Sequence, residues 1–82
     1  MPYLLRMPLA FVLISVETGG EDEVIEALRR IKQVSKVYRV YGIYDIIVRL
    51  ETRNMDELNK IVWWNIRRLD KVRSTVTMIV QR

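Results

Sequence analysis

The chain carries one pattern twice. Residues 11–40 and residues 45–78 each run from an apolar segment through a Glu-Thr pair, a helical stretch and an Arg-Arg pair to a second apolar segment. The offset between the copies is 34 at the Glu-Thr pair (51 − 17) and 38 at the Arg-Arg pair (67 − 29). The difference of four residues is about one helical turn at ~3.6 residues per turn. The sequence therefore predicts one strand–helix–strand unit used twice, with a longer second helix.

Both helical stretches are amphipathic. Residues 21–31 repeat apolar side chains at a helical spacing, with acids at the start and bases at the end that complement the helix dipole. For the second helix, Asn54 is a suitable N-cap and Glu57, three residues on, completes a capping-box-like arrangement. This helix is expected to run to about Leu69, with Asn65 falling within its apolar face.

Four strands are predicted from the β-branched and aromatic runs, over residues 10–16, 37–41, 45–50 and 74–80. The middle two form a hairpin, and each half of the chain needs a parallel, right-handed crossover. Two interleaved units give an α+β, ferredoxin-like βαββαβ fold, a four-stranded antiparallel sheet with both helices on one face. We predict a single domain over residues 10–82 after an N-terminal tail over residues 1–9, with Met1 and Met7 both open as the start.

One face of this sheet is left without a cover. The predicted strands 10–16 and 45–50 carry apolar side chains on both of their faces, which is typical of strands that are covered on both sides. The two helices cover only one face, so the other is expected to meet the sheet of a second copy. We therefore predict a homodimer.

Composition excludes several kinds of chemistry. The 82 residues contain no cysteine and no histidine, which removes thiolate chemistry, the usual general base and the commonest metal ligand. No nucleophile–base pair, metal-ligand spacing or phosphate-binding glycine loop is present, so we expect a protein that is not an enzyme and holds no cofactor or metal. The longest apolar stretch, residues 7–16, is half the ~20 residues of a membrane span, and we expect a cytoplasmic protein with no membrane partner.

The most specific local pattern is Gly42-Ile43-Tyr44-Asp45. It can be explained by folding alone, since glycine supplies a turn conformation, tyrosine packs and aspartate caps. It can equally hold a small zwitterion, because a carboxylate accepts hydrogen bonds from an ammonium group and free backbone N–H groups donate to a carboxylate. Thr75 and Thr77 are either ordinary strand formers or two hydroxyls presented on one side of the last strand.

Other polar and aromatic residues have two interpretations each. Trp63 and Trp64, on the flanks of the second helix, either pack against a neighbour or mark a contact surface. The basic residues at the end of that helix complement its dipole or contact phosphate. Asn65 is interpreted as a bonded core polar group. No recognition element supports sequence-specific DNA binding by this chain.

These residues together resemble a known family, the RAM domain, which is the effector-binding half of Lrp/AsnC-type transcriptional regulators in bacteria and archaea. The resemblance covers nearly the whole chain from residue 10. Its most specific part is Val40-x-Gly42-x-Tyr44-Asp45; the remainder is pattern, including Ala10-Phe11-Val12-Leu13-Ile14, Ile66-Arg67-Arg68-Leu69 and Thr75-x-Thr77-x-Ile79-Val80.

The resemblance implies the ferredoxin-like unit, sheet-to-sheet pairing, further assembly into higher multiples of dimers, and amino-acid effectors bound where dimers meet. Carried over, it nominates Gly42, Tyr44 and Asp45 as ligand-binding residues, and also Thr75 and Thr77. Family members carry an N-terminal helix-turn-helix domain, and only nine residues precede the first predicted strand here, so we expect a stand-alone RAM domain. It would sense an amino acid and modulate a full-length Lrp/AsnC-type regulator.

Two departures and two alternatives accompany this interpretation. Gln33 and Lys71 stand before Val34 and Val72, where glycine is common in the family, which alters both turns. The same fold and pairing also occur in small dimeric α/β-barrel enzymes, and in that case Trp63 and Asn65 would be the candidate functional residues. The third possibility is an assembly partner of a regulator that binds no ligand.

Overall fold

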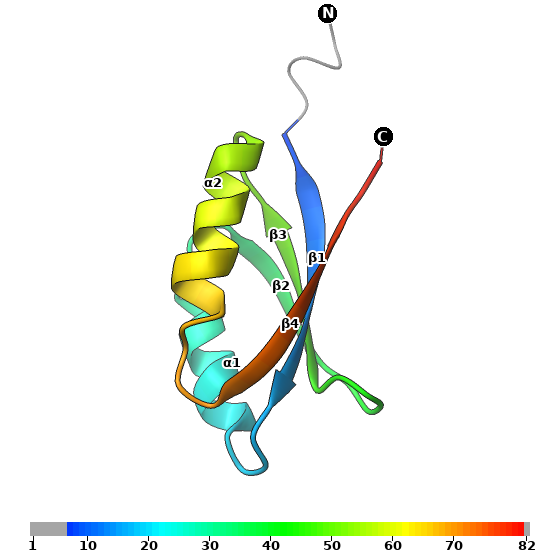
Figure 1. The fold of residues 1–82 in the computed structure, drawn as a ribbon, viewed down its shortest axis with the longest axis vertical. Helices are drawn as coiled ribbons and strands as arrows, with labels where there is room; N and C mark the ends of the chain where they lie inside the picture. The colour runs from blue at the N-terminus through cyan, green and yellow to red at the C-terminus, as the bar shows by residue number, and fades with distance from the viewer. Residues whose placement is uncertain (1–6, 82) are drawn as a thin grey trace, which may run out of the picture.

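A four-stranded antiparallel sheet with two helices on one face forms the protein (Figure 1). The computed structural model describes residues 7–81. In chain order, the elements are β1 (Leu9–Val16), α1 (Glu21–Arg29), β2 (Val34–Arg39), β3 (Ile46–Glu51), α2 (Met55–Lys60), its π-helical continuation η2 (Ile61–Ile66), and β4 (Val72–Ile79). The ferredoxin-like βαββαβ fold predicted from the sequence is confirmed.

The strand order is β2-β3-β1-β4, and every neighbouring pair is antiparallel. β1 and β2 are therefore parallel with β3 between them, and β3 and β4 are parallel with β1 between them. Each helix is the crossover of one strand–helix–strand unit, and the two units interleave as the repeat predicts. The predicted tail falls mostly on residues 1–6, which lie outside the described residues, and the first strand begins at Leu9, one residue before the predicted domain boundary.

The core lies between the helices and one face of the sheet. Along β1, alternate residues Ala10, Val12, Ile14 and Val16 are buried, since successive strand side chains point to opposite faces. The other buried apolar side chains come from β3 and the helices: Val24, Leu28, Ile46, Val48, Leu50, Leu58, Ile61 and Ile66.

The second helix differs from the sequence-based expectation. Its start is as predicted, since the Asn54 Oδ1 accepts the Glu57 N–H at 2.8 Å. Glu57 reaches back one residue further than a regular capping box, and its Oε1 accepts the Arg53 N–H at 2.7 Å. From Ile61 onward the helix widens, and the Arg67 N–H donates to the Val62 carbonyl five residues earlier, at 2.9 Å.

The wider turn corrects the predicted place of Asn65. A π-helical turn brings residues five apart onto one face, so Ile61 and Ile66 both enter the core. Asn65 is exposed and does not lie in the apolar face where α-helical spacing puts it. Trp63 and Trp64 lie outside the core as predicted, with 49% and 56% of their surface exposed.

The predicted hairpin is present with a longer loop. β2 begins at Val34, three residues earlier than expected, where the chain pairs with Leu50 through a bulge. It ends at Arg39, and the Val40 N–H donates to the Asp45 carbonyl at 2.9 Å, which closes a loop over residues 40–45. This loop contains the Gly42 turn.

The face of the sheet that turns away from the helices is apolar. Register places Phe11 and Leu13 of β1 there, beside Ile47, Val76 and Met78 of the two neighbouring strands. Val76 and Met78 are 41% and 50% exposed in the single chain. This apolar sheet face is the surface that the sequence predicts to meet another copy.

Candidate functional site

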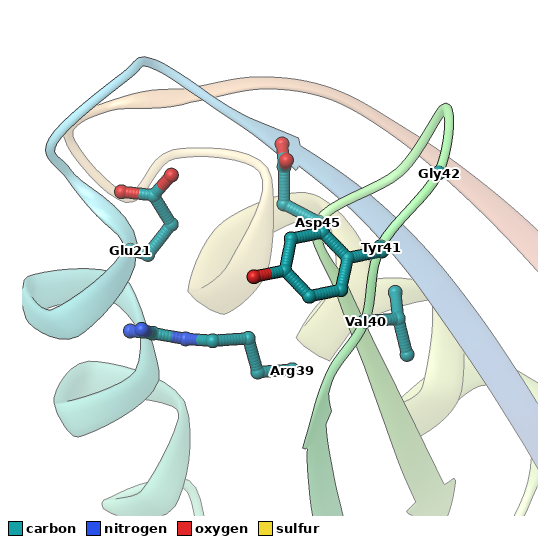
Figure 2. Close-up of a pocket in the computed structure, with 6 residues that line it drawn as sticks. All are labelled: Glu21, Arg39, Val40, Tyr41, Gly42 and Asp45. Carbon is teal, nitrogen blue, oxygen red and sulfur yellow. The ribbon is translucent and has the colours of Figure 1, made fainter.

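The hairpin loop forms one wall of an open hollow of about 380 Å³ at the end of the sheet. Its lining residues are Glu21, Arg39, Val40, Tyr41, Gly42 and Asp45. Figure 2 shows Arg39 and Tyr41 extending from the hairpin toward α1, and Glu21 rising from the first turn of that helix. Two of the nominated residues, Gly42 and Asp45, thus lie together, and we call this cavity the hairpin hollow.

Asp45 is fixed by three hydrogen bonds. Its N–H donates to the Ile14 carbonyl at 2.9 Å, and its own carbonyl accepts the Val40 N–H. Its Oδ2 accepts the Val16 N–H at 2.8 Å, at the bulge where the β1 ladder becomes irregular. The carboxylate therefore replaces a backbone acceptor at this bulge. Its second oxygen receives no hydrogen bond from the described residues, and Asp45 is one of the residues that line the hollow.

Gly42 is required by its backbone conformation. Its φ is +145°, a region that other residues rarely adopt. A Cβ built at this position meets no atom of the chain within 4 Å. Within one subunit, then, glycine serves the turn itself, and close approach of a ligand to Gly42 stays a prediction.

Free donors surround the turn. Within the described chain, the N–H groups of residues 41–44 make no hydrogen bond to any protein acceptor. Of these residues, Tyr41 and Gly42 line the hollow together with Asp45. A short loop with unpaired amide donors and a carboxylate acceptor is suited to a molecule that carries both an anionic and a cationic group.

Sequence reasoning did not nominate four of the lining residues, Glu21, Arg39, Val40 and Tyr41. Arg39 forms an ion pair through Nη2 with Asp22 of α1, and Glu21 accepts the Gly19 N–H through Oε1 at 3.0 Å. Tyr41 lines the hollow in the single chain, whereas the nominated Tyr44 does not. The helix charges were visible in the sequence as dipole complements, but their approach to the hairpin depends on how α1 packs.

The two nominated threonines lie elsewhere in the subunit. Thr75 pairs with Ile14 and Thr77 with Val12, so both belong to β4, on the opposite side of β1 from the hairpin. Two strand spacings of ~4.8 Å separate β4 from β3 by about 10 Å. Thr77 instead lines a different hollow, beside Trp63. The assignment of these threonines to a ligand site stays a prediction.

Metal-binding clusters and membrane-spanning helices are both absent from the described residues. Residues 7–81 contain no group of three or more histidine, cysteine, aspartate or glutamate side chains that could hold a metal ion. Among the same residues, no helix is long and apolar enough to cross a membrane.

A carboxyl group with a shifted pKa lies away from the hairpin hollow. Glu57 accepts the Arg53 N–H and, at 3.1 Å through Oε2, the Gln33 side-chain amide. The backbone hydrogen bond from Arg53 is the main cause that lowers the pKa of Glu57 below its ordinary value. Its contacts tie α2 to the start of β2, and this role is structural.

Comparison with known proteins identifies the class of protein. The model of the Lrp/AsnC ligand binding domain matches residues 9–82. A search of curated proteins finds no match. The chain belongs to the Lrp/AsnC ligand-binding domain family, and the resemblance noted from the Gly42 turn and its flanking strands is confirmed.

Solved structures agree with this assignment. The crystal structure of FFRP-DM1 is 37% identical, with a TM-score of 0.89 over 92% of this chain and 100% of that one. TTHA0845 from Thermus thermophilus is 33% identical, with a TM-score of 0.89 over 93% of this chain and 95% of that one. The complex of the transcriptional regulator NMB0573 with L-Met, from Neisseria meningitidis, has a TM-score of 0.87. That regulator is 13% identical and shares the fold; this chain covers 54% of its length and is itself covered to 99%.

Proposed function

We propose that this protein is an oligomeric module that binds an amino-acid effector at the hairpin hollow, where a neighbouring subunit completes the site. The observation that carries the proposal is a turn that contains both an Asp45 carboxylate oxygen without a hydrogen bond and N–H groups of residues 41–44 without a protein acceptor. An amino acid presents complementary groups, an α-ammonium and an α-carboxylate, at a fixed separation. Both kinds of charged hydrogen bond are stronger than their neutral counterparts.

The charges around the hollow support the same ligand class. Glu21 adds a second carboxylate on the side of α1, and Arg39 adds a guanidinium. A zwitterion can therefore be oriented from two sides, its ammonium group by a carboxylate and its carboxylate by N–H donors. The regulator NMB0573, which shares the fold, is bound to L-Met in its solved complex, so the fold accommodates an amino acid in that protein.

Assembly is needed because the hollow is open in one subunit. At the tip of the hairpin, Tyr41 and Ile43 are almost wholly exposed, at 106% and 89%. Large exposed side chains around a hollow are suited to packing against another subunit. The apolar sheet face provides a second, separate contact for dimerisation, so a dimer and a multiple of dimers can form without competing for one surface.

The role proposed for the assembly is to modulate a full-length Lrp/AsnC-type regulator according to amino-acid supply. Two alternatives remain open to experiment, a small dimeric α/β-barrel enzyme and a ligand-free assembly partner. The hairpin hollow favours the effector-binding module over both, since its polar groups pair with a bound zwitterion and none is placed as a nucleophile with a base.

A thermal-shift screen against the twenty amino acids tests the proposal first. A ligand that binds only the folded assembly stabilises it and so raises the melting temperature. At a ligand concentration of one hundred times the Kd, the free energy of unfolding increases by about 2.7 kcal/mol. No shift with any of the twenty would favour the ligand-free partner. A hit is then titrated by calorimetry, with wild type compared with two variants of Asp45.

The two variants separate ligand binding from folding. Asp45→Asn keeps an oxygen that accepts the Val16 N–H but removes the charge, and it should weaken ligand binding by about ten- to a hundredfold, the scale of a charged hydrogen bond. Asp45→Ala should lose this affinity and also lower stability. Asp56→Asn, an exposed acid of α2, is the matched control and should bind as wild type does. Equal affinity of wild type and Asp45→Asn would remove Asp45 from the site.

A further inference from the structure

The hairpin hollow is lined by two carboxylates that have no cationic partner. These are Glu21 and Asp45, and the same lining contains one guanidinium, that of Arg39. Within residues 7–81, neither Glu21 nor Asp45 forms an ion pair, whereas Arg39 is paired with Asp22 of α1. The cation of the lining therefore already has a counterion.

The charge of this region is opposite in sign to that of the chain. Three acids, Glu21, Asp22 and Asp45, and one base, Arg39, leave a net charge of −2 around the hollow. The whole chain carries +4, from 14 basic and 10 acidic residues. The negative hollow is thus a local feature that the overall composition does not produce.

The dipole of α1 accounts for part of this charge. Acids in the first turn of a helix stabilise its N-terminus, and this turn contains Glu21, Asp22 and Glu23. Glu23 is paired with Lys71 at 3.6 Å and so adds no net charge. Asp45 belongs to the hairpin, and the helix dipole gives no reason for it to line the same hollow as a helix acid. The Glu21 Oε1 accepts the Gly19 N–H, and its Oε2 receives no hydrogen bond from the described residues.

Apolar surface lies beside the two carboxylates. Val40 and Tyr41 of the hairpin complete the lining. Figure 2 shows Glu21 on the side of α1 and Asp45 on the side of the hairpin, so that the two acids flank the hollow. Its volume of about 380 Å³ is within the range of small-molecule sites, about 300–1,000 Å³. An aromatic ring beside an acid suits an alkyl chain that ends in a cation.

We propose that the effector of the hairpin hollow is a cationic amino acid, of the lysine or arginine type. This inference rests on the proposed function and names the ligand class of the same site. The α-ammonium group binds Asp45 and the α-carboxylate binds the N–H groups of residues 41–44. The aliphatic part of the ligand side chain packs on Val40 and Tyr41, and its terminal cation binds Glu21.

Other classes of amino acid fit the same charges less well. A neutral amino acid has no second cation for Glu21, which then stays unpaired as the ligand displaces water from the hollow. An acidic amino acid adds a negative charge beside three acids, and Arg39 would have to leave Asp22 to bind it. A cationic amino acid satisfies both carboxylates of the lining and leaves the Arg39–Asp22 ion pair intact.

Calorimetric titration with matched pairs of ligands tests the class. L-norleucine is L-lysine without its terminal ammonium group, and L-citrulline has a neutral urea where L-arginine has a guanidinium. The whole chain should bind the cationic member of at least one pair about tenfold or more tightly than the neutral member, because a charged hydrogen bond is gained. L-glutamate should bind more weakly than all four.

A variant of Glu21 locates the contact. Glu21→Gln keeps an oxygen that can accept the Gly19 N–H but removes the charge. It should weaken binding of the cationic ligand about tenfold or more and leave the neutral ligand unchanged, so the preference within the pair approaches one. Glu26→Gln removes the same charge from an exposed position of α1 outside the hollow and should keep the preference. Since both ligands are compared on one variant, a loss of folded protein does not imitate this result.

The outcomes separate this inference from the proposed function. A neutral or acidic amino acid that binds as tightly as lysine and arginine would overturn the cationic class and leave the amino-acid site in place. An unchanged preference in Glu21→Gln would also overturn it, and a lower melting temperature of that variant would then assign Glu21 to the helix dipole alone. Absence of binding by every amino acid would overturn both proposals.

Discussion

Gly20 and Lys71 form a contact whose energy a double-mutant cycle can measure. Lys71 lies between η2 and β4 with a φ of +77°, a conformation that costs a residue with a Cβ about 1 kcal/mol. Its carbonyl accepts the Glu17 N–H at 2.8 Å. A Cβ added at Gly20 would lie 2.9 Å from both Cβ and Cδ of Lys71 and 3.2 Å from the Glu17 carbonyl oxygen. Gly20→Ala therefore creates a clash that depends on the Lys71 side chain.

The expected energies follow from these contacts. Gly20→Ala should lower the free energy of unfolding by about 1–3 kcal/mol, the cost of overpacking, with a few tenths more from the poorer helix N-cap. Lys71→Gly should be nearly neutral. The substitution stabilises the fold by relieving about 1 kcal/mol of backbone strain. It destabilises the fold by removing a partly exposed ion pair with Glu23 at 3.6 Å and by raising the conformational entropy of the unfolded chain. In the double variant both obstructing atoms of Lys71 are gone, so the two changes should couple by about 1–2 kcal/mol.

Urea unfolding followed by tryptophan fluorescence measures these energies, at a single protein concentration because assembly contributes to stability. Gly19→Ala is the matched control. Its φ is +88° and a Cβ there meets nothing within 4 Å, so it should cost about 1 kcal/mol and add independently to Lys71→Gly. If Gly20→Ala and Lys71→Gly also add within about 0.5 kcal/mol, the packing of Lys71 over Gly20 is not the reason for glycine at position 20.

Three further outcomes are expected. Because the folded pKa of Glu57 lies below its ordinary value of 4.5, its carboxylate stabilises the fold above that pH, and the contribution is lost as pH falls through the lower value. Glu57→Gln should consequently destabilise more at pH 6 than at pH 3 in thermal melts, and an equal effect at both would contradict this. Light scattering should give a dimer or a multiple of it. Leu13→Asp, which places a charge on the apolar sheet face, should dissociate or unfold this assembly, whereas Lys36→Asp on the exposed β2 should not. A stable wild-type monomer at micromolar concentration would refute the sheet contact. The purified chain should bind duplex DNA only weakly and lose that binding with added salt, and sequence-selective binding at physiological salt would argue against an effector module.

The fold could be predicted from the repeat because each helix and strand has a signal in its own local sequence. Periodic apolar side chains, the Asn54 cap and the Gly42 turn depend only on neighbours in the sequence, and each was found where expected within a few residues. Two of the six residues that line the hairpin hollow could also be predicted, since Gly42 and Asp45 lie in the turn itself. Glu21 and Arg39 were not, because their place in the hollow depends on α1 packing beside the hairpin.

The interior of the second helix marks the limit of periodicity. An α-helical spacing of ~3.6 residues puts Asn65 on the buried face, and nothing local indicates a wider turn. The core decides instead, since burying both Ile61 and Ile66 requires a five-residue spacing. Local sequence determines where the helix starts, whereas core packing determines which of its residues are buried beyond Lys60.

The π-helical turn contains one residue more than an α-helical turn would use to bury the same two isoleucines. Asn65, which is exposed, is the residue that could be deleted. Deleting it would bring the two buried isoleucines to an α-helical spacing of four while leaving both in the core. The residues after the deletion would then approach the two tryptophans by one position, so that Arg67 and Arg68, whose guanidinium groups stack on these two rings, would follow them by three residues instead of four. The inner surface of the protein would be conserved and its outer surface rearranged. The length of this single turn thus makes the exposed face of the helix adjustable by insertion or deletion, independently of the stability of the sheet beneath it.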